Sequence, residues 1–222
     1  MAGESHGIRS IFAAIRTAPM PLKTSADRPA EPKPFVTISR QGGAGGRAIA
    51  QRLVARLNAL DPGEEPWAVW DKQLVEKIAE DHKIARELVE SLGESSRTWL
   101  EEFLAALSID SDETEARIYQ MVASTIRALA HKGRVVIVGR GGVYITRSMP
   151  GGVHLRLVAP VEYRARHMAD QLKVSYDEAL SHVRKLDKQR AAFYRKYWPS
   201  KALTVEAFTL TINTAMVSEE QA

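Results

Sequence analysis

The chain of 222 residues contains no cysteine, and this absence excludes several kinds of chemistry at once. Without thiols there is no disulfide framework, no thiolate nucleophile and no zinc–sulfur site. The six histidines show no paired spacing of the kind that metal ligands take, so a metal-hydrolase function has little support. Any catalysis therefore has to come from other side chains, and the redox compartment cannot be argued from thiol chemistry.

Long apolar runs are absent as well. No stretch approaches the roughly 20 residues that a membrane-spanning helix needs. The apolar run at residues 11–15 is too short for a secretory signal and is flanked by arginine. We therefore expect a cytoplasmic protein that has no membrane partner.

The composition that is present fits one globular domain. Hydrophobic residues make up 45% of the chain, charged residues 26% and aromatic residues 7%, and this length is enough for one ordinary core. The net charge of +4 and the pI near 9.3 favour an anionic partner. Nucleic acid, a membrane surface and a phosphorylated metabolite would all satisfy that charge.

The first 34 residues differ from the rest of the chain. They hold five prolines and show no sustained apolar periodicity. We predict a flexible N-terminal tail at residues 1–34, followed by one domain at residues 35–222.

From residue 35 onward, short apolar runs alternate with longer amphipathic stretches, which is typical of a parallel sheet whose strands are joined by helices. The predicted strands lie at residues 35–38, 67–70, 134–138, 153–159 and 205–212. The predicted helices carry apolar stripes within residues 49–57, 74–78, 99–107 and 118–129, and Gly133 stops the last of them. The four tryptophans, Trp67, Trp70, Trp99 and Trp198, are expected to pack rather than to stack on bases.

A glycine-rich turn follows the first predicted strand. Four of the five residues from Gly42 to Gly46 are glycine, which lets backbone N–H groups meet a phosphate without Cβ obstruction, while the next helix adds its positive end. The generic phosphate loop reads Gly-x4-Gly-Lys-Ser/Thr, but here Arg40 stands at the first glycine and Gly46 at the lysine. Because a guanidinium can hold phosphate oxygens bidentately, we expect Arg47 to replace the lysine. The alternative is a tight strand-to-helix connection that binds no ligand.

Residues 176–197 predict a long amphipathic helix. One broad face carries Leu180, Val183, Leu186, Phe193 and Tyr194. Asp187 and Arg190 fall on that same face, three residues apart. They either pair with each other as a structural ion pair or turn toward a ligand.

Several segments, in consistent order, resemble the cytidylate kinase-like family. Residues 36–47 (Val-Thr-Ile-Ser-Arg-Gln-Gly-Gly-Ala-Gly-Gly-Arg) look like its opening, and residues 70–74 (Trp-Asp-Lys-Gln-Leu) are similar to its Tyr-Asp-Lys-x-Leu segment. Residues 136–140 (Val-Ile-Val-Gly-Arg) resemble its second glycine turn, residues 187–194 (Asp-Lys-Gln-Arg-Ala-Ala-Phe-Tyr) its lid helix, and residues 212–214 (Ile-Asn-Thr) a late segment. The similarity spans about residues 35–216, which makes chance agreement hard to sustain.

The resemblance implies a fold and an activity. The fold is the α/β P-loop NTPase three-layer fold, a five-stranded parallel sheet with helices on both faces. A helical acceptor-binding insert is expected at about residues 72–131 and a helical lid at about residues 175–200. The implied reaction is phosphoryl transfer from ATP with Mg²⁺ to a nucleoside monophosphate, and an acceptor like CMP or dCMP is favoured.

The resemblance also implies site residues. The phosphate and ATP site comprises Ser39, Arg40, Gly42, Gly43, Ala44, Gly45, Gly46 and Arg47. The acceptor site comprises Asp71, Arg140, Asp187 and Arg190. The implied catalytic groups are Arg47, Arg184, Asp187 and Arg190. The arginines would contact phosphates, and Asp187 would orient one of these arginines or accept a hydrogen bond from a hydroxyl or amine of the acceptor.

This sequence departs from the family at three positions. Gly46 stands for the lysine, Ala48 for the magnesium-binding hydroxyl and Gly141 for an aspartate that contacts the acceptor sugar. No metal ligand is therefore carried over, although Ser39 and Asp71 are candidates.

Three hypotheses from different classes follow. The leading one is the small-molecule nucleotide kinase. The second is a catalytically weak or inactive nucleotide-binding regulatory protein, motivated by Gly46 and Ala48. The third is a nucleic-acid-binding module, motivated by the basic pI alone and opposed by the lack of aromatic residues interleaved with the basic ones. The oligomeric state is not given by the sequence.

Overall fold

The computed structural model describes residues 32–63, 65–71, 113–198, 204–218 and 221–222. In chain order the elements are β1 (Phe35–Arg40), α2 (Gly46–Leu60), β2 (Ala68–Trp70), α6 (Glu113–Lys132), β3 (Val135–Val138), α7 (Gly142–Thr146), β4 (Gly152–Val158), α8 (Val161–Leu172), α9 (Tyr176–Tyr197), the 3₁₀ helix η1 (Val205–Ala207) and β5 (Leu210–Asn213). Residues 1–31 of the tail predicted at residues 1–34, and most of the predicted insert, lie outside the described residues.

The five strands form one parallel sheet in the order β2-β3-β1-β4-β5. Ile38 on the central strand β1 pairs with Val138 of β3 on one side and with Leu155 of β4 on the other. The predicted α/β fold is confirmed, and four of the five strands start and end within two residues of their predicted limits.

The fifth strand is a correction. The sequence predicted a strand over residues 205–212, but Val205–Ala207 form η1 and β5 runs only from Leu210 to Asn213. The chain has to return to the edge of the sheet beside β4, and the short 3₁₀ turn makes that approach before pairing begins. An apolar run alone does not distinguish the turn from the strand.

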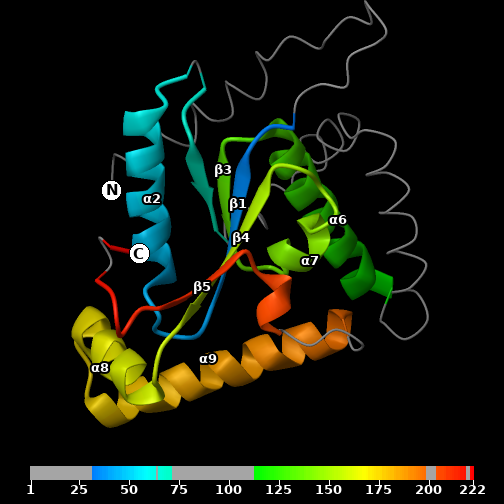
Figure 1. The fold of residues 1–222 in the computed structure, drawn as a ribbon. Helices are drawn as coiled ribbons and strands as arrows, with labels where there is room; N and C mark the ends of the chain where they lie inside the picture. The colour runs from blue at the N-terminus through cyan, green and yellow to red at the C-terminus, as the bar shows by residue number, and fades with distance from the viewer. Residues whose placement is uncertain (1–31, 64, 72–112, 199–203, 219–220) are drawn as a thin grey trace, which may run out of the picture.

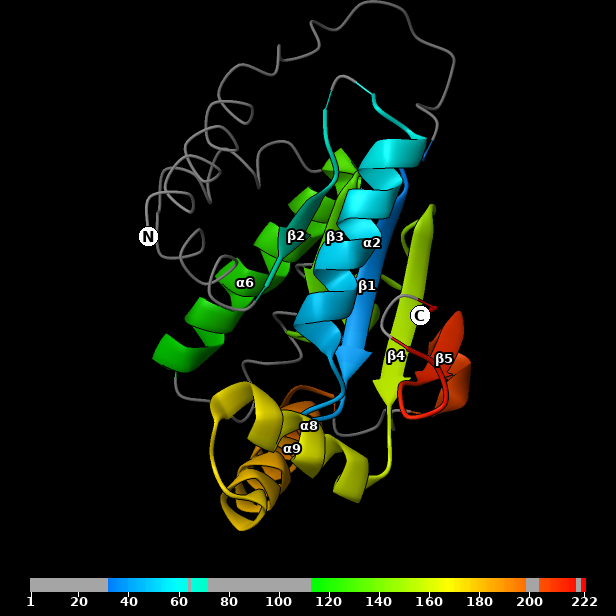
Figure 2. The same ribbon diagram turned by 90° about the vertical axis from the view of Figure 1, so that its left-hand side faces the viewer.

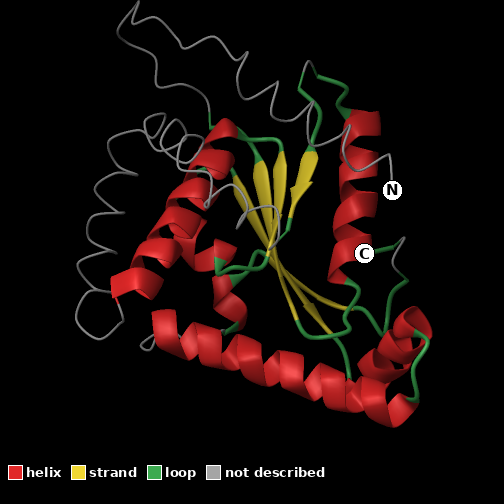
Figure 3. Cartoon of the chain, turned by 180° about the vertical axis from the view of Figure 1, so that it is seen from behind, coloured by secondary structure: helices red, strands yellow, loops and turns green. Residues whose placement is uncertain are grey.

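Helices cover both faces of the sheet, with α2 on one side and α6 and α7 on the other (Figures 1 and 3). Successive side chains of a strand point to opposite faces. Val36, Ile38 and Val138 accordingly pack with Ile49 of α2, whereas Phe35 packs in the second core with the side chains of α6 and α7. The sheet is therefore buried between two hydrophobic cores, one on each face.

Helix α6 ends as its sequence predicts. Val122, Ile126 and Leu129 are buried, and Gly133 takes a left-handed conformation with φ +79° that stops the helix. Trp67, Trp70 and Trp198 are buried too, which confirms the packing role expected for them. Trp99 lies outside the described residues.

Helices α8 and α9 lie across the carboxyl edge of the sheet, the edge toward which β1 and β4 point (Figure 2). The predicted long helix is confirmed, since α9 spans Tyr176–Tyr197. Ser175 caps it, because its hydroxyl accepts from the Glu178 N–H and the Glu178 carboxylate accepts from the Ser175 N–H. No helix in the described ranges is long and apolar enough to cross a membrane.

Candidate active site

The glycine-rich turn joins the carboxyl end of β1 to the start of α2. Gly43 and Gly45 have φ values of +77° and +75°, which fall in the left-handed region that glycine adopts without strain. Gly45 is the N-cap of α2, and neither a side-chain cap nor an acidic residue in the first turn satisfies the helix end. A helix start of this kind attracts an anion because its N–H groups and its dipole both present positive charge.

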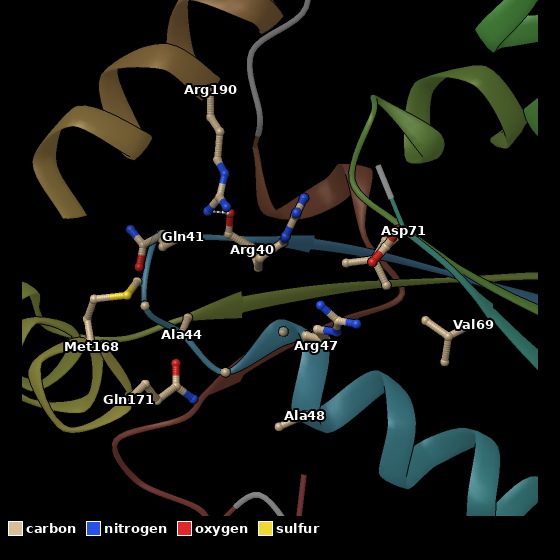
Figure 4. Close-up of a pocket in the computed structure, with 14 residues that line it drawn as sticks. Arg40, Gln41, Ala44, Arg47, Ala48, Val69, Asp71, Met168, Gln171 and Arg190 are labelled. Carbon is tan, nitrogen blue, oxygen red and sulfur yellow. Dashed lines mark hydrogen bonds between the residues drawn. The ribbon is translucent and has the colours of Figure 1, made fainter. Parts of the chain in front are cut away.

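A first cavity of ≈ 330 Å³ opens in front of this turn (Figure 4). It is lined by Arg40, Gln41, Gly43, Ala44, Gly45, Gly46, Arg47, Ala48, Val69, Asp71, Val138, Met168, Gln171 and Arg190. Figure 4 shows Arg190 reaching from α9 to the end of β1, where its Nη1 donates to the carbonyl oxygen of Arg40 at 3.0 Å. Backbone from the glycine turn and side chains from α8 and α9 therefore meet in one place.

A second glycine turn follows β3, the neighbour of β1. Gly139, Arg140 and Gly141 have φ values of +85°, +54° and +71°, so three successive residues are left-handed and one of them carries a side chain. Such strain persists only where the surroundings impose it. The Tyr119 hydroxyl donates to the Arg140 carbonyl at 3.1 Å, and the Arg140 guanidinium lies 5.8 Å from the Phe193 ring centre.

A second cavity of ≈ 630 Å³ lies beside this turn. It is lined by Ser39, Arg40, Gln41, Gly139, Arg140, Arg156, Leu186, Asp187, Gln189, Arg190, Ala191, Phe193 and Tyr194. Arg40, Gln41 and Arg190 line both cavities and so form the boundary between them. Two arginines therefore lie where the two cavities adjoin.

The boundary arginines carry unusually poorly solvated charge. The pKa of Arg40 is lowered to about 10, first by burial and then by the positive charge of Arg190, with Arg140 contributing further. The pKa of Arg190 is also lowered, mainly by burial, although Asp187 and Tyr194 oppose the shift. Clustered guanidinium groups that repel each other in a desolvated place gain most from an anion, so the boundary is suited to phosphate.

Asp187 is fastened to the glycine turn rather than to its helical neighbour. Its Oδ1 accepts from the Gly42 N–H at 2.7 Å, and its Oδ2 pairs with Arg164 Nη1 at 2.6 Å. Buried Arg164 also donates to the carbonyl oxygens of Gly42 and Ala159. The predicted alternative of an Asp187–Arg190 pair is thus replaced by a tie between α8, α9 and the turn.

This tie leaves little space around the turn. A Cβ atom on Gly42 would lie 3.1 Å from the Val183 carbonyl oxygen, and one on Gly43 would lie 2.6 Å from the Arg164 carbonyl oxygen. His167 Nδ1 donates a hydrogen bond to the Gly43 carbonyl oxygen at 2.9 Å. The turn is therefore held in one conformation before any ligand arrives, which lowers the entropic cost of binding.

Two predicted site residues line a different cavity from most of the residues with which they were predicted to act. Ser39, predicted at the phosphate loop, lines the second cavity, with its Oγ 3.5 Å from Tyr194 Oη. Asp71, predicted on the acceptor side, lines the first cavity together with Val69. The period of two along strands explains both, because Ser39 shares a face with Thr37, and Asp71 shares one with Val69.

The predicted arginines are not equally placed. Arg40, Arg140 and Arg190 come together at the cavities, and Arg47 lines the first cavity from an exposed position on α2. Arg184 is exposed on α9 and lines neither cavity, so the geometry gives it no contact with a ligand there.

Sequence reasoning missed Arg156, Arg164 and Tyr194. Arg156 lies on β4, and the available signal was a charged residue between the apolar residues Leu155 and Leu157 of that strand. Arg164 belongs to α8, a helix that begins directly after Pro160 and that the strand pattern did not predict. The sequence places Tyr194 on the apolar face of its helix, but Tyr194 lines the second cavity and its hydroxyl lies 3.5 Å from Ser39 Oγ.

Metal coordination has limited support among the described side chains. They contain no group of three or more histidine or acidic residues that could hold an ion. Asp71 brings a carboxylate to the first cavity, and carboxylate oxygen suits Mg²⁺. Since Mg²⁺ at nucleotide sites is often bound through one or two carboxylates, water and the phosphates themselves, the residues present fit that ion.

Comparisons with known proteins identify a family and a fold. Residues 35–216 match the cytidylate kinase-like family. A cytidylate kinase of Ignicoccus hospitalis is 26% identical over 185 residues, which cover 83% of this chain and 92% of the relative. A crystal structure of an uncharacterized protein from Eubacterium ventriosum shares the fold with a TM-score of 0.61 at 20% identity, covering 82% of this chain and 88% of that one. A shikimate kinase from Acinetobacter baumannii, in complex with shikimate, aligns with a TM-score of 0.44 at 15% identity, covering 86% and 88%.

Proposed function

This chain belongs to the cytidylate kinase-like family, and from that membership we propose that it transfers a phosphoryl group from ATP to a nucleoside monophosphate. The family and the relative named cytidylate kinase support nucleotide kinase chemistry in general. The choice of ATP as donor and of a CMP-like acceptor is the finer part of the proposal.

One observation carries the proposal: Arg40 and Arg190 stand at the boundary of two cavities, with Arg140 close behind. Phosphoryl transfer needs donor and acceptor held in line, with the charge on the transferring oxygens neutralised. Cations at a boundary shared by both cavities act on the group that crosses it. A single binding site for one nucleotide would not need such an arrangement.

The first cavity is assigned to the donor. The start of α2 and the left-handed glycines face its polyphosphate, and Arg47 adds charge at the rim. Asp71 and the phosphate oxygens would hold Mg²⁺, which when bound withdraws charge from the phosphates.

The second cavity is assigned to the acceptor. Arg140 and Arg156 supply charge for its monophosphate, while Phe193 and Tyr194 offer aromatic surface to its nucleoside. Gly141 stands where related kinases have an aspartate, and its Cβ would lie 2.1 Å from the Trp198 ring. The acceptor sugar therefore has to be recognised by other groups that line this cavity.

The reaction then needs no covalent intermediate. A phosphate oxygen of the acceptor attacks the terminal phosphorus of ATP, the bond to the β-phosphate oxygen breaks, and a nucleoside diphosphate and ADP result. Arg40 and Arg190 would balance the charge of the group in flight. The tie between Asp187, Arg164 and the turn would keep the donor aligned by fixing the turn that holds it.

A phosphotransfer assay with Mg²⁺ and ATP against CMP, dCMP, UMP and AMP tests the proposal. We expect ADP formation that depends on one of these acceptors and is lost in Arg190→Met. Binding of ATP without turnover of any acceptor would count against the kinase and for the second candidate function.

That second candidate is a nucleotide-binding regulatory protein without catalysis. Gly46 and Ala48 favour it, because the generic loop has a lysine and a hydroxyl in these places. Arg47→Ala should then weaken ATP binding while no acceptor is phosphorylated at any Mg²⁺ concentration.

A further inference from the structure

Arg40 passes between two glycines that come from different parts of the chain. A Cβ atom on Gly46 would lie 2.9 Å from Arg40 Cγ, and a Cβ atom on Gly139 would lie 2.0 Å from Arg40 Nη1. Real Cβ atoms essentially never approach other atoms within 3.0 Å. Neither glycine can therefore be replaced while Arg40 keeps this course.

Gly46 stands where the generic phosphate loop carries its lysine, whose ammonium reaches the β- and γ-phosphates. The stem of Arg40 covers the point from which that lysine side chain would start. A lysine at 46 would therefore require the Arg40 side chain to move from this position, and the two positive charges would also repel each other. The two departures from the generic loop, Arg40 in place of its first glycine and Gly46 in place of its lysine, therefore belong to one structural feature.

The position of Arg40 relative to the two cavities supports a role for its charge. Arg40 lines both cavities, whereas the exposed Arg47 lines the donor cavity but not the acceptor cavity. The Arg40 carbonyl accepts from Arg190 Nη1, which fixes the end of β1 against α9. The left-handed conformation of Gly139 opens the space that the guanidinium occupies.

We propose that Arg40, and not Arg47, takes the part of the missing lysine and holds the phosphoryl group while it crosses from the donor to the acceptor cavity. Gly46 and Gly139 are small in order to admit it. The inference rests on the proposed function. Arg40 exchanges no atom in the step: the bond to the β-phosphate oxygen breaks, the bond to the acceptor oxygen forms, and the guanidinium stays charged throughout.

A charge-relocation experiment tests this assignment. Arg40→Gly, Gly46→Lys and the double variant that combines both are compared with the wild-type chain and with Arg47→Ala. For each, the dissociation constant for ATP is measured by calorimetry without acceptor, turnover is measured with the best acceptor, and the melting temperature verifies folding.

We expect Arg40→Gly to lose about 100-fold in turnover and about tenfold in ATP affinity. In the wild-type background Gly46→Lys should lower turnover, because the new side chain collides with Arg40. In the Arg40→Gly background it should raise turnover by at least about tenfold. The loss of turnover in Arg47→Ala should be about tenfold smaller than the loss in Arg40→Gly, because the charge of Arg47 lies at the rim of the cavity.

Two results would overturn the assignment. One is an Arg40→Gly variant with wild-type ATP affinity and turnover. The other is a Gly46→Lys substitution that does equal harm in both backgrounds at normal melting temperatures. Because the ATP dissociation constants need no acceptor, they test Arg40 even if the wild-type chain transfers no phosphoryl group, and that failure would count against the proposed function alone.

Discussion

The two cavities on either side of Arg40 differ in the groups that line them. The donor cavity is shaped largely by backbone, with the turn from Gln41 to Gly46 and the start of α2 as its walls. The acceptor cavity is shaped by side chains of β1, β4, α9 and the second glycine turn, among them four arginines. A backbone cradle recognises phosphate by its shape and charge alone, whereas a side-chain cavity can differ between relatives and set the choice of acceptor.

This difference predicts separable effects. Substitutions at the boundary should affect turnover most, substitutions in the backbone cradle should affect donor binding, and substitutions among the acceptor side chains should affect acceptor binding. Each of the following changes would support the division or break it.

The largest effect is expected at the boundary, for Arg190→Met. Under the proposed function the guanidinium would stabilise charge on the group in transfer, so kcat should fall by about 100-fold to 1000-fold while ATP affinity changes by about threefold or less. Steady-state kinetics and calorimetry measure the two quantities, and Lys188→Met, at an exposed position of the same helix, is the control. A rise confined to the KM for the acceptor would move Arg190 out of the boundary role.

The next effect is expected in the cradle, for Gly45→Val. Gly45 has φ +75°, so a β-branched side chain both strains the backbone and enters the donor cavity. ATP affinity should fall by about 30-fold, which is about 2 kcal/mol, without a matching loss of acceptor affinity.

Gly151→Val controls for backbone strain, because Gly151 has φ +82° but lines neither cavity. It should lower the melting temperature and leave ATP affinity intact. Equal losses of ATP affinity in both variants would mean that general destabilisation, rather than the cradle, explains Gly45→Val.

A smaller effect is expected in the acceptor cavity, for Arg156→Gln. The substitution keeps a polar side chain of similar reach but removes the charge, so the KM for the acceptor should rise about tenfold with ATP affinity unchanged. Exposed Arg147→Gln is the matched control. A loss of ATP affinity in Arg156→Gln would show that the two cavities are not independent.

The smallest effect is expected from pH. The pKa of Arg40 is lowered to about 10, so its guanidinium is charged and attracts phosphate below that pH and becomes neutral above it. The kcat/KM for ATP should therefore be halved near pH 10. Bound phosphate favours the charged form, so kcat at saturating ATP should decline only at higher pH.

Rate profiles between about pH 8 and 10.5 measure this limb, with the melting temperature followed in parallel. The Arg40→Gln variant should lack the limb because it has no titrating group there. Persistence of the same limb in that variant would assign it to another residue.

Local patterns in the sequence were sufficient for much of the fold. Periodicity predicted the helix Tyr176–Tyr197, the stop at Gly133 and four of the strands, because each depends on residues close in the chain. It failed at Val205–Ala207, where the path of the chain to the sheet edge outweighs an apolar run. The sequence pattern did not predict helix α8, because its apolar face is narrow. Its contacts with α9 form only when the chain folds.

The sequence by itself determined the glycine turn and the family, since a phosphate-binding turn is a local backbone conformation that needs glycine at fixed positions. It could not say which cation faces the phosphate. Arg40 and Gly139 lie about a hundred residues apart, as their numbering shows, and only the pairing of β1 with β3 brings them into contact. Asp187 likewise meets Gly42 and Arg164 through the packing of α8 and α9 on the turn. Contacts between distant segments depend on the whole fold, so tertiary structure decided which charges share the site.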